Sequence, residues 1–391
     1  MKYLSAQYIF TNSSHPIKRG VICAEDDGTI VSIEDSGGKL AERHSVEFFN
    51  GIIVPGFVNC HCHLELSYLK NEIPAGNGLA DFLMKVNSFR NSLQKDINQA
   101  IQDADEEMLK GGIVLCADIC NSSLTFTLKK ESRIKYISLL EVFGIDSVRA
   151  EIRMNEILEL AKTAKKMDLS HWIVPHSVYS VSLPLFKLIK NHTADNKITS
   201  IHFMESQEEE ILLKDHTGAL MESYKKFLHS VSDMEIPQNH INVINDEMTL
   251  SGNLILIHNT FVKENQIKKL KNRSGLYWCL CPNSNLYIEQ KLPPVEMLIN
   301  EGCDIVIGTD SLSSNKSLSI IEELKTIQLH FPHLRLEELI RWATMNGAKA
   351  LGEDLSFGSI EPGKRPGLVL LKNVDLVNLK LLPDTTVRHL I

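Results

Sequence analysis

The feature that most limits the fold is an alternation of short apolar segments with longer segments of helical periodicity, from Val54 to about Asp310. Eight apolar segments have the length and composition of buried strands: IVPGFVNCH, GIVLCAD, YISLLEVF, WIVPHSV, ITSIHFM, NLILIHN, LYWCLCP and DIVIGTD. Eight strand–helix units in roughly 250 residues match a (β/α)8 barrel better than an open doubly wound sheet. A dinucleotide-binding sheet is also disfavoured, because no GxGxxG sequence follows an early strand.

Helices are predicted between these strands from the spacing of apolar residues. In one segment apolar residues recur at three- and four-residue steps, as on one face of a helix: Leu93, Ile97, Ala100, Ile101, Ala104 and Met108. Gly111 and Gly112 follow and are expected to end this helix. A second set of apolar residues with helical spacing precedes the fourth strand: Met154, Ile157, Leu158, Ala161 and Ala164. The span from Ser206 to Gly252 is too long for one tight connection, so we expect a helix around Ala219 to Ser230 and a loop able to cover an active site.

The two ends of the chain have a different pattern. Residues 1–53 contain short strand segments separated by the turn signals EDDGT and DSGG, and the tail GSIEPGKRPGLVLLKNVDL has the pattern of a hairpin and strand. We therefore expect an α/β protein in two parts. Residues 54–354 would form a TIM-type (β/α)8 barrel, and residues 1–53 with 355–391 a small composite β-sandwich domain beside it.

Charge and composition narrow the class of partner. A net charge of -8 over 391 residues, gathered into no run, argues against nucleic acid and an anionic membrane surface, and favours a small-molecule substrate. We find no apolar run long enough for a membrane span and no signal peptide, and the eight cysteines lack a secreted-framework spacing, so a cytoplasmic location is expected. The sequence leaves open whether the chain is a homo-oligomer.

The stretch VNCHCHLEL places two histidines and two cysteines in alternation. Side chains along a strand alternate faces, so His61 and His63 should point one way and Cys60 and Cys62 the other. We assign the histidines to the barrel interior at the end of the first strand, and the cysteines to the face that packs on helices. The alternative is a structural zinc on both cysteines plus Cys279 and Cys281, but CxC pairs lack the CxxC spacing of such sites.

Further residues whose side chains can bind a metal ion lie at the ends of later strands. His202 in SIHFMES ends the fifth, His258 in LILIHNT the sixth, and Asp310 in GTDSLSSN the eighth. Any one of these residues alone is more often structural, a hydrogen-bonded histidine or a helix-capping aspartate. Their occurrence at the ends of correctly ordered strands favours a metal site, since a catalytic zinc has three or more protein ligands and an open position.

These motifs, in this order and at these separations, resemble the amidohydrolase superfamily and specifically its mononuclear deaminase branch. ATMNGAKALG and GSIEPGKRPGLVLL are similar to that family's closing helix and last composite-domain strands. The resemblance implies that His61, His63, His202 and Asp310 ligate one divalent ion. Zinc fits this ligand set, and ferrous iron is also compatible with it. Binuclear relatives carry a carboxylated lysine at the end of the fourth strand, where WIVPHSVYS offers none.

The resemblance also implies catalytic roles. Asp310 would accept a proton from the metal-activated water, Glu205 would protonate a ring nitrogen, and His258 would stabilise the developing oxygen. The alternative for Glu205 is a helix-capping acid, because a helix begins in SQEEEILLK. We expect the glutamates of that segment, Glu208, Glu209 and Glu210, to supply this capping and to form only a solvated face.

Four residues are candidates for binding substrate: His176 in VPHSVYS, Arg90 after the first strand, Asn285 in CPNSN, and Ser311 beside Asp310. A core role for His176, a solvent-facing Arg90 and ordinary turn formation by the other two are alternatives.

The branch includes deaminases of adenosylhomocysteine, methylthioadenosine and aminodeoxyfutalosine. The sequence HLELS resembles the aminodeoxyfutalosine branch, and residues 82–95 contain no carboxylate. The resemblance therefore favours aminodeoxyfutalosine or a related adenosine derivative as the substrate. Guanine deaminase, imidazolonepropionase-like and chlorohydrolase-like activities stay as alternatives, as does a non-catalytic binding protein.

Overall fold

The structure is a computed structural model that describes residues 1–39, 45–90, 96–227, 234–248 and 251–391. Its central part holds eight parallel strands in two four-stranded sheets. One sheet contains β6 (Phe57–Cys62), β7 (Ile113–Cys120), β8 (Lys135–Val142) and β9 (His171–Pro175); the other contains β10 (Ile198–Phe203), β11 (Asn253–His258), β12 (Leu276–Leu280) and β13 (Asp304–Ile307). Single parallel bridges, Ser177–His202 and Cys62–Asp310, join the two sheets at both edges.

Each of the eight predicted strand segments overlaps one of these strands, with one difference at the first. The segment IVPGFVNCH is divided at Gly56, because its first residues end β5 (Val46–Pro55), which belongs to another sheet.

Helices and short helical turns connect the strands. Those before β10 are η1 (Leu64–Leu69), α1 (Gly78–Arg90), α2 (Ile97–Lys110), α3 (Phe126–Glu131), η2 (Ser147–Arg149), α4 (Ala150–Lys166) and α5 (Leu183–His192). Those after it are α6 (Gln207–Asp215), α7 (Gly218–Phe227), α8 (His240–Asn242), η4 (Val243–Glu247), α9 (Glu264–Leu270), α10 (Pro282–Glu289), α11 (Val295–Asn300), α12 (Ile320–His330), α13 (Leu336–Arg341), η5 (Trp342–Asn346) and α14 (Gly347–Ala350).

The three helices predicted from the sequence correspond to α2, α4 and α7. Helix α2 begins after Asp96, whose side chain accepts a hydrogen bond from the backbone N–H of Gln99. The helix ends at Gly111, and Gly112 has the left-handed φ of +83° that favours glycine. The predicted helical residue Leu93 and the end of the helix expected at Ser230 lie outside the described residues.

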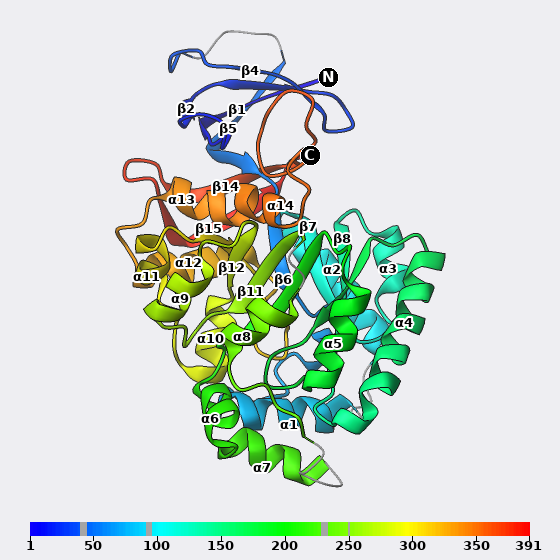
Figure 1. Cartoon of the computed structure of the whole chain (residues 1–391). Helices are drawn as coiled ribbons and strands as arrows, with labels where there is room; N and C mark the ends of the chain where they lie inside the picture. Colours follow the sequence, from blue (N-terminus) through cyan, green and yellow to red (C-terminus); the bar gives the residue numbers. More distant parts are fainter. Residues whose placement is uncertain (40–44, 91–95, 228–233, 249–250) are drawn as a thin grey trace.

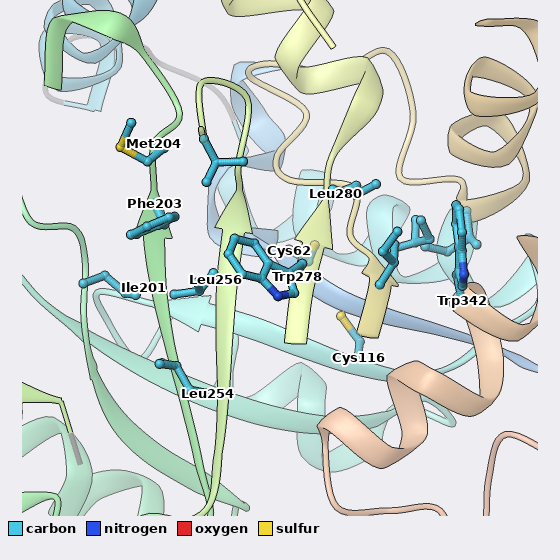
Figure 2. Packing of buried hydrophobic residues seen from close by; sticks show 14 of the residues in the cluster. Cys62, Cys116, Ile201, Phe203, Met204, Leu254, Leu256, Trp278, Leu280 and Trp342 are labelled. Carbon is cyan, nitrogen blue, oxygen red and sulfur yellow. The ribbon is translucent and has the colours of Figure 1, made fainter. Parts of the chain in front are cut away.

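Two apolar clusters lie on the two faces of the parallel strands. The larger one unites helix residues with strand residues such as Leu254, Leu256 and Trp278, and it includes Cys62 beside Cys116 (Figure 2). The second takes residues from all eight strands, among them Val58, Leu115, Ile137, Val174, Ile198, Ile255, Cys279 and Val306, and is completed by α14.

The prediction that Cys60 and Cys62 share the helix-facing side was wrong for Cys60. Cys62 packs in the larger cluster as expected, but Cys60 lies in the second cluster with Cys279 and Cys281. The pairing of β6 with β7 shifts register between Asn59 and Cys62, and such a bulge breaks the alternation of faces along a strand. His61 and Cys60 therefore do not point to opposite faces.

The two ends of the chain meet in one sheet with the strand order β15-β14-β5-β1-β3-β4, and β2 pairs with β1. Its strands are β1 (Lys2–Ile9), β2 (Ile17–Lys18), β3 (Val21–Ala24), β4 (Ile30–Glu34), β5 (Val46–Pro55), β14 (Leu368–Asp375) and β15 (Lys380–His389). Figure 1 shows this sheet at one end of the molecule, with α1, α6 and α7 at the other end. Among the described residues, no helix combines the length and apolar character that a membrane crossing requires.

Candidate active site

The predicted ligand residues meet at the ends of the parallel strands. The ring centroids of His61 and His63 are 4.8 Å apart, as are those of His61 and His202, and the Nε2 atoms of His61 and His63 are separated by 3.2 Å. Asp310 joins this group, because its Oδ1 lies 3.7 Å from Nε2 of His61 and 3.6 Å from Nε2 of His63. Four side chains from three distant parts of the sequence thus surround one point.

The end of β13 fits closely against β6. The backbone N–H groups of Thr309 and Asp310 both donate to the carbonyl oxygen of His61, each at 3.0 Å. A Cβ atom added at Gly308 would lie 2.8 Å from Cβ of His61 and 2.9 Å from Sγ of Cys279, so only glycine fits there. The glycine before Thr309 and Asp310 therefore allows the aspartate to approach the histidine pair.

Asp310 is held as a carboxylate. Its Oδ2 accepts hydrogen bonds from the hydroxyls of Ser284 at 2.6 Å and Ser314 at 2.7 Å. Burial acts to raise its pKa, but the contacts with His61 and His63 outweigh burial and hold the pKa of Asp310 well below its usual range. The carboxylate is the form that binds a cation.

Burial favours the neutral form of His63 and His202, which is also the form that binds a metal. Burial lowers the pKa values of His63 and His202 well below the ordinary histidine value, and neighbouring imidazoles lower them further. Nδ1 of His202 donates to the carbonyl oxygen of His176 at 2.8 Å, which leaves its Nε2 available to a metal. The residues present therefore fit a divalent cation with three nitrogen ligands and one oxygen ligand.

Two groups among the described residues bring potential metal-ligand atoms within 4.8 Å of one another: His61, His63 and His202, and Glu141, His176 and His202. Neither group includes a cysteine. Cys62 also lies in a different cluster from Cys60, Cys279 and Cys281. The alternative of a four-cysteine zinc site therefore has no support in the described part of the chain.

Glu205 and His258 face each other beside this centre. Oε1 of Glu205 lies 3.5 Å from Nε2 of His258, and both side chains are buried. Burial raises the pKa of Glu205 well above its ordinary value, and the negative charge of Asp310 raises it further. Burial lowers the pKa of His258 to about 3. These shifts favour a protonated carboxyl group on Glu205 next to a neutral imidazole on His258.

Asn285 lies behind His258 rather than at the substrate. Its side-chain amide donates to Nδ1 of His258 at 3.1 Å, so the ring hydrogen lies on Nε2 and faces Glu205. Asn285 is buried and is not among the described residues that line the cavity. The structure thus assigns it to the orientation of His258, which differs from the substrate contact predicted from the sequence.

The acidic residues after Glu205 differ in one respect from the prediction. Ser206 and Glu209 cap the start of α6, as expected for this run of acidic residues. Glu209, however, is fully buried rather than part of a solvated face. Its Oε1 accepts from the backbone N–H of Glu205 at 2.6 Å, and its Oε2 lies 2.8 Å from Nε2 of His240. Glu209 therefore fixes the backbone that carries Glu205.

A cavity of about 260 Å³ opens above these groups. The predicted substrate residues Arg90, His176 and Ser311 line it together with His63, His202, Glu205, His258 and Asp310. Its apolar wall comes from α1 and α7, including Leu79, Phe82, Leu83, Val86, Leu220 and Tyr224. The region predicted to cover the site therefore contributes α7 to that wall.

Glu141 and Asn121 are among the polar cavity residues that sequence reasoning missed. Glu141 is the second-last residue of β8 and is 5% exposed, and burial raises its pKa to about 7. Nδ2 of Asn121 donates to its Oε2 at 2.9 Å. The available signal was the segment YISLLEVF, in which one carboxylate interrupts an apolar strand close to its carboxyl end.

Comparisons with known proteins agree with this site. The chain is 29% identical over 337 residues to the adenosine deaminase of Helicobacter pylori, an alignment that covers 82% of this chain and 79% of the relative. It is 23% identical to the 5-methylthioadenosine/S-adenosylhomocysteine deaminase of Pyrococcus abyssi, over 94% of this chain and 84% of the relative.

Its fold is similar to the crystal structure of Helicobacter pylori aminofutalosine deaminase in complex with methylthio-coformycin, with a TM-score of 0.81, 24% identity and full coverage of both chains. A sequence profile of the amidohydrolase family matches residues 52–388. The resemblance first noticed in the histidine motifs is thereby confirmed, and the chain belongs to the amidohydrolase family.

Proposed function

We propose that this protein is a hydrolytic deaminase, dependent on one divalent metal ion, that releases ammonia from the 6-amino group of an adenine-type nucleoside. The observation that carries this proposal is the meeting of a histidine–aspartate ligand set with Glu205 and His258 in one cavity. A site that only stored a metal ion would need neither of the last two residues. The deaminase names of the relatives support the same reaction.

The metal would be held by His61, His63, His202 and Asp310. A set of three imidazoles and one carboxylate suits zinc, with ferrous iron as the alternative. A single ion is favoured, because β9 ends in Pro175 and is followed by His176, with no lysine there. When bound, a divalent cation supplies Lewis-acid activation of a water molecule, whose pKa it lowers toward neutrality.

The chain's own residues would move the protons. Asp310 accepts the proton that the attacking water loses, and the hydroxyls of Ser284 and Ser314 keep its carboxylate in place. Glu205, whose raised pKa favours the protonated form, donates its proton to a nitrogen of the purine ring as water adds to C6. The Nε2–H of His258 then donates to the oxygen that gains negative charge. The proton held by Asp310 passes to the amino group, the C6–N bond breaks and ammonia leaves. The remaining hydroxyl proton is released as C6=O forms and restores Glu205.

The substrate class follows from the walls of the cavity. The apolar residues of α1 and α7 suit a flat purine and the apolar part of a substituent on its sugar. His176, Arg90 and Ser311 are the further substrate contacts that we propose, since all three line the cavity. Aminodeoxyfutalosine or a related adenosine derivative is the favoured substrate.

We also infer that residues 54–354 form a closed (β/α)8 barrel, and that residues 1–53 and 355–391 form a composite β domain. The bridges between the two parallel sheets and the joint sheet of both chain ends support this division. The cytoplasmic location, the absence of nucleic-acid and membrane partners, and homo-oligomer formation stay predictions.

Ammonia release from metal-loaded protein tests the proposal. Adenosine, 5′-deoxyadenosine, methylthioadenosine, S-adenosylhomocysteine and aminodeoxyfutalosine would be compared with guanine and a chlorotriazine. We expect one ammonia for each 6-aminopurine nucleoside consumed, with the corresponding change in purine absorbance. Release of chloride from the triazine, or of ammonia from guanine alone, would contradict the proposal.

A further inference from the structure

A third carboxylate lines the cavity besides Asp310 and Glu205. Glu141 comes from β8, whereas His176 follows β9 and His202 lies in β10. Its side chain is 3% exposed, and its Oε1 lies 3.7 Å from Nδ1 of His202. His258, at the end of β11, stands on the other side of His202, with the two rings stacked at 5.3 Å. Glu141 therefore faces the part of the cavity away from Glu205 and His258.

One oxygen of Glu141 is held in place, and the other has no hydrogen-bond partner within the described chain. Oε2 accepts the amide hydrogen of Asn121, while Oε1 is buried and without a partner. Nδ1 of His202 does not serve it, because that hydrogen already goes to the carbonyl oxygen of His176. A buried acceptor left unpaired is unfavourable, so a group that donates to it would be bound favourably.

The orientation of Glu141 is fixed through Asn121. The backbone N–H of Asn121 donates to Oε1 of Glu65 at 3.1 Å, and its side-chain oxygen accepts from Nη2 of Arg90 at 3.0 Å. Because Arg90 occupies the amide oxygen, the amide nitrogen must face Glu141. These contacts determine which oxygen of Glu141 meets Asn121 and which faces the cavity.

A metal ion is a poor occupant for this position. Glu141, His176 and His202 are close enough to form a ligand group, but Nδ1 of His202 is bonded to a carbonyl oxygen and Nδ1 of His176 lies 2.6 Å from the hydroxyl of Ser180. Because Oε1 of Glu141 is an acceptor without a partner in the described chain, the matching ligand group is a hydrogen-bond donor such as a sugar hydroxyl.

We propose that Glu141 binds the substrate's sugar, with Oε1 accepting hydrogen bonds from its vicinal hydroxyl groups. This proposal rests on the proposed function, since a purine held between Glu205 and His258 directs its sugar toward another wall of the cavity. Glu141 would then select ribonucleosides over deoxynucleosides, and Asn121 would act as a positioning residue.

The test compares the binding of adenosine, 2′-deoxyadenosine and 3′-deoxyadenosine by calorimetry, in protein that is wild type at Glu141 and in Glu141→Gln, both carrying Glu205→Gln so that the nucleosides are consumed only slowly. A hydrogen bond to a charged group is worth about 1.5–3 kcal/mol, so loss of one hydroxyl should weaken binding to the wild type about 10- to 150-fold. In Glu141→Gln the amide oxygen should turn toward Asn121 and the NH₂ group toward the cavity. The preference for adenosine should then fall to within about threefold.

Glu65→Gln is the matched control, because Glu65 is buried beside Arg90 and Asn121 but has both oxygens occupied, by Asn121 and Ser122. It should keep the wild-type preference. The proposal is overturned if wild type binds the three nucleosides equally or binds none, or if Glu141→Gln keeps the full preference. A loss of metal with the preference unchanged would mean that Glu141 only supports His202. Ammonia release, measured separately, decides the proposed function.

Discussion

Oε1 of Glu205 lies 3.5 Å from Nε2 of His258, and both groups face the cavity that the metal-ligand residues line. The pair has the features of an acid and its hydrogen-bonding partner. Burial favours the protonated form of the carboxyl group and the neutral form of the imidazole, which makes Glu205 the proton donor of the pair.

Replacement of Glu205 by glutamine should abolish most of the activity without loss of metal. The amide keeps the size of the side chain but cannot transfer the proton, and general acid–base catalysis contributes about 10²–10⁴-fold. Steady-state ammonia release and elemental analysis would be measured together. Glu210→Gln is the control, because Glu210 pairs with Lys263 at the surface of the same segment. Near-normal turnover of Glu205→Gln would remove the proposed role.

Glu209 should be important for stability, in contrast to its neighbour Glu210. Replacement of Glu209 by alanine leaves the N–H groups of Glu205 and Ser206 and the ring of His240 without their buried acceptor. We expect a loss of about 3 kcal/mol in the free energy of unfolding, and less than about 0.5 kcal/mol for Glu210→Ala. Urea unfolding measures both values. Equal small losses would mean that the buried contacts of Glu209 contribute little.

Lys129 should be required to balance the charge of Asp118. Its Nζ lies 2.6 Å from Oδ2 of Asp118, and both side chains are fully buried. Oδ1 of Asp118 accepts the backbone N–H of Leu64, directly after His63. Lys129→Met would leave an uncompensated buried charge and should cost about 3–5 kcal/mol, whereas the exposed Lys130→Met should be nearly neutral. Thermal unfolding of the two variants provides the comparison.

The pH dependence of stability should report on Glu323. Burial raises its pKa from 4.5 to about 8, so between these values the folded chain keeps a proton that the unfolded chain releases. Unfolding then releases a proton, and this group contributes stability at low pH that is lost as pH rises through 8. Urea titrations of chelator-treated protein at pH 5, 6.5 and 8 should show a steeper decline for wild type than for Glu323→Gln. Parallel declines would contradict the assignment.

Much of the architecture could be predicted because it depends on local sequence pattern. Each of the eight apolar segments overlaps a strand, and the three- and four-residue spacing predicted α2 and α4. The meeting of His61, His63, His202 and Asp310 could be predicted because parallel strands end on one side of their sheet.

The remaining features depend on contacts between distant residues. The inward position of Cys60 follows from a register shift against β7, which alternation within β6 does not reveal. Glu209 is buried because His240 lies against it from another element, and Asn285 was assigned to substrate because its contact with His258 is not encoded locally. Glu141 was missed because a single glutamate in a strand is usually solvent-facing.

The most direct test of the account is the metal content and ligand environment of the active protein. Elemental analysis combined with X-ray absorption at the metal edge should give one divalent ion per chain, bound through nitrogen and oxygen, and both the ion and the activity should be lost in His202→Ala. Two ions per chain, sulfur in the coordination shell, or full activity in metal-free protein would contradict the central claim.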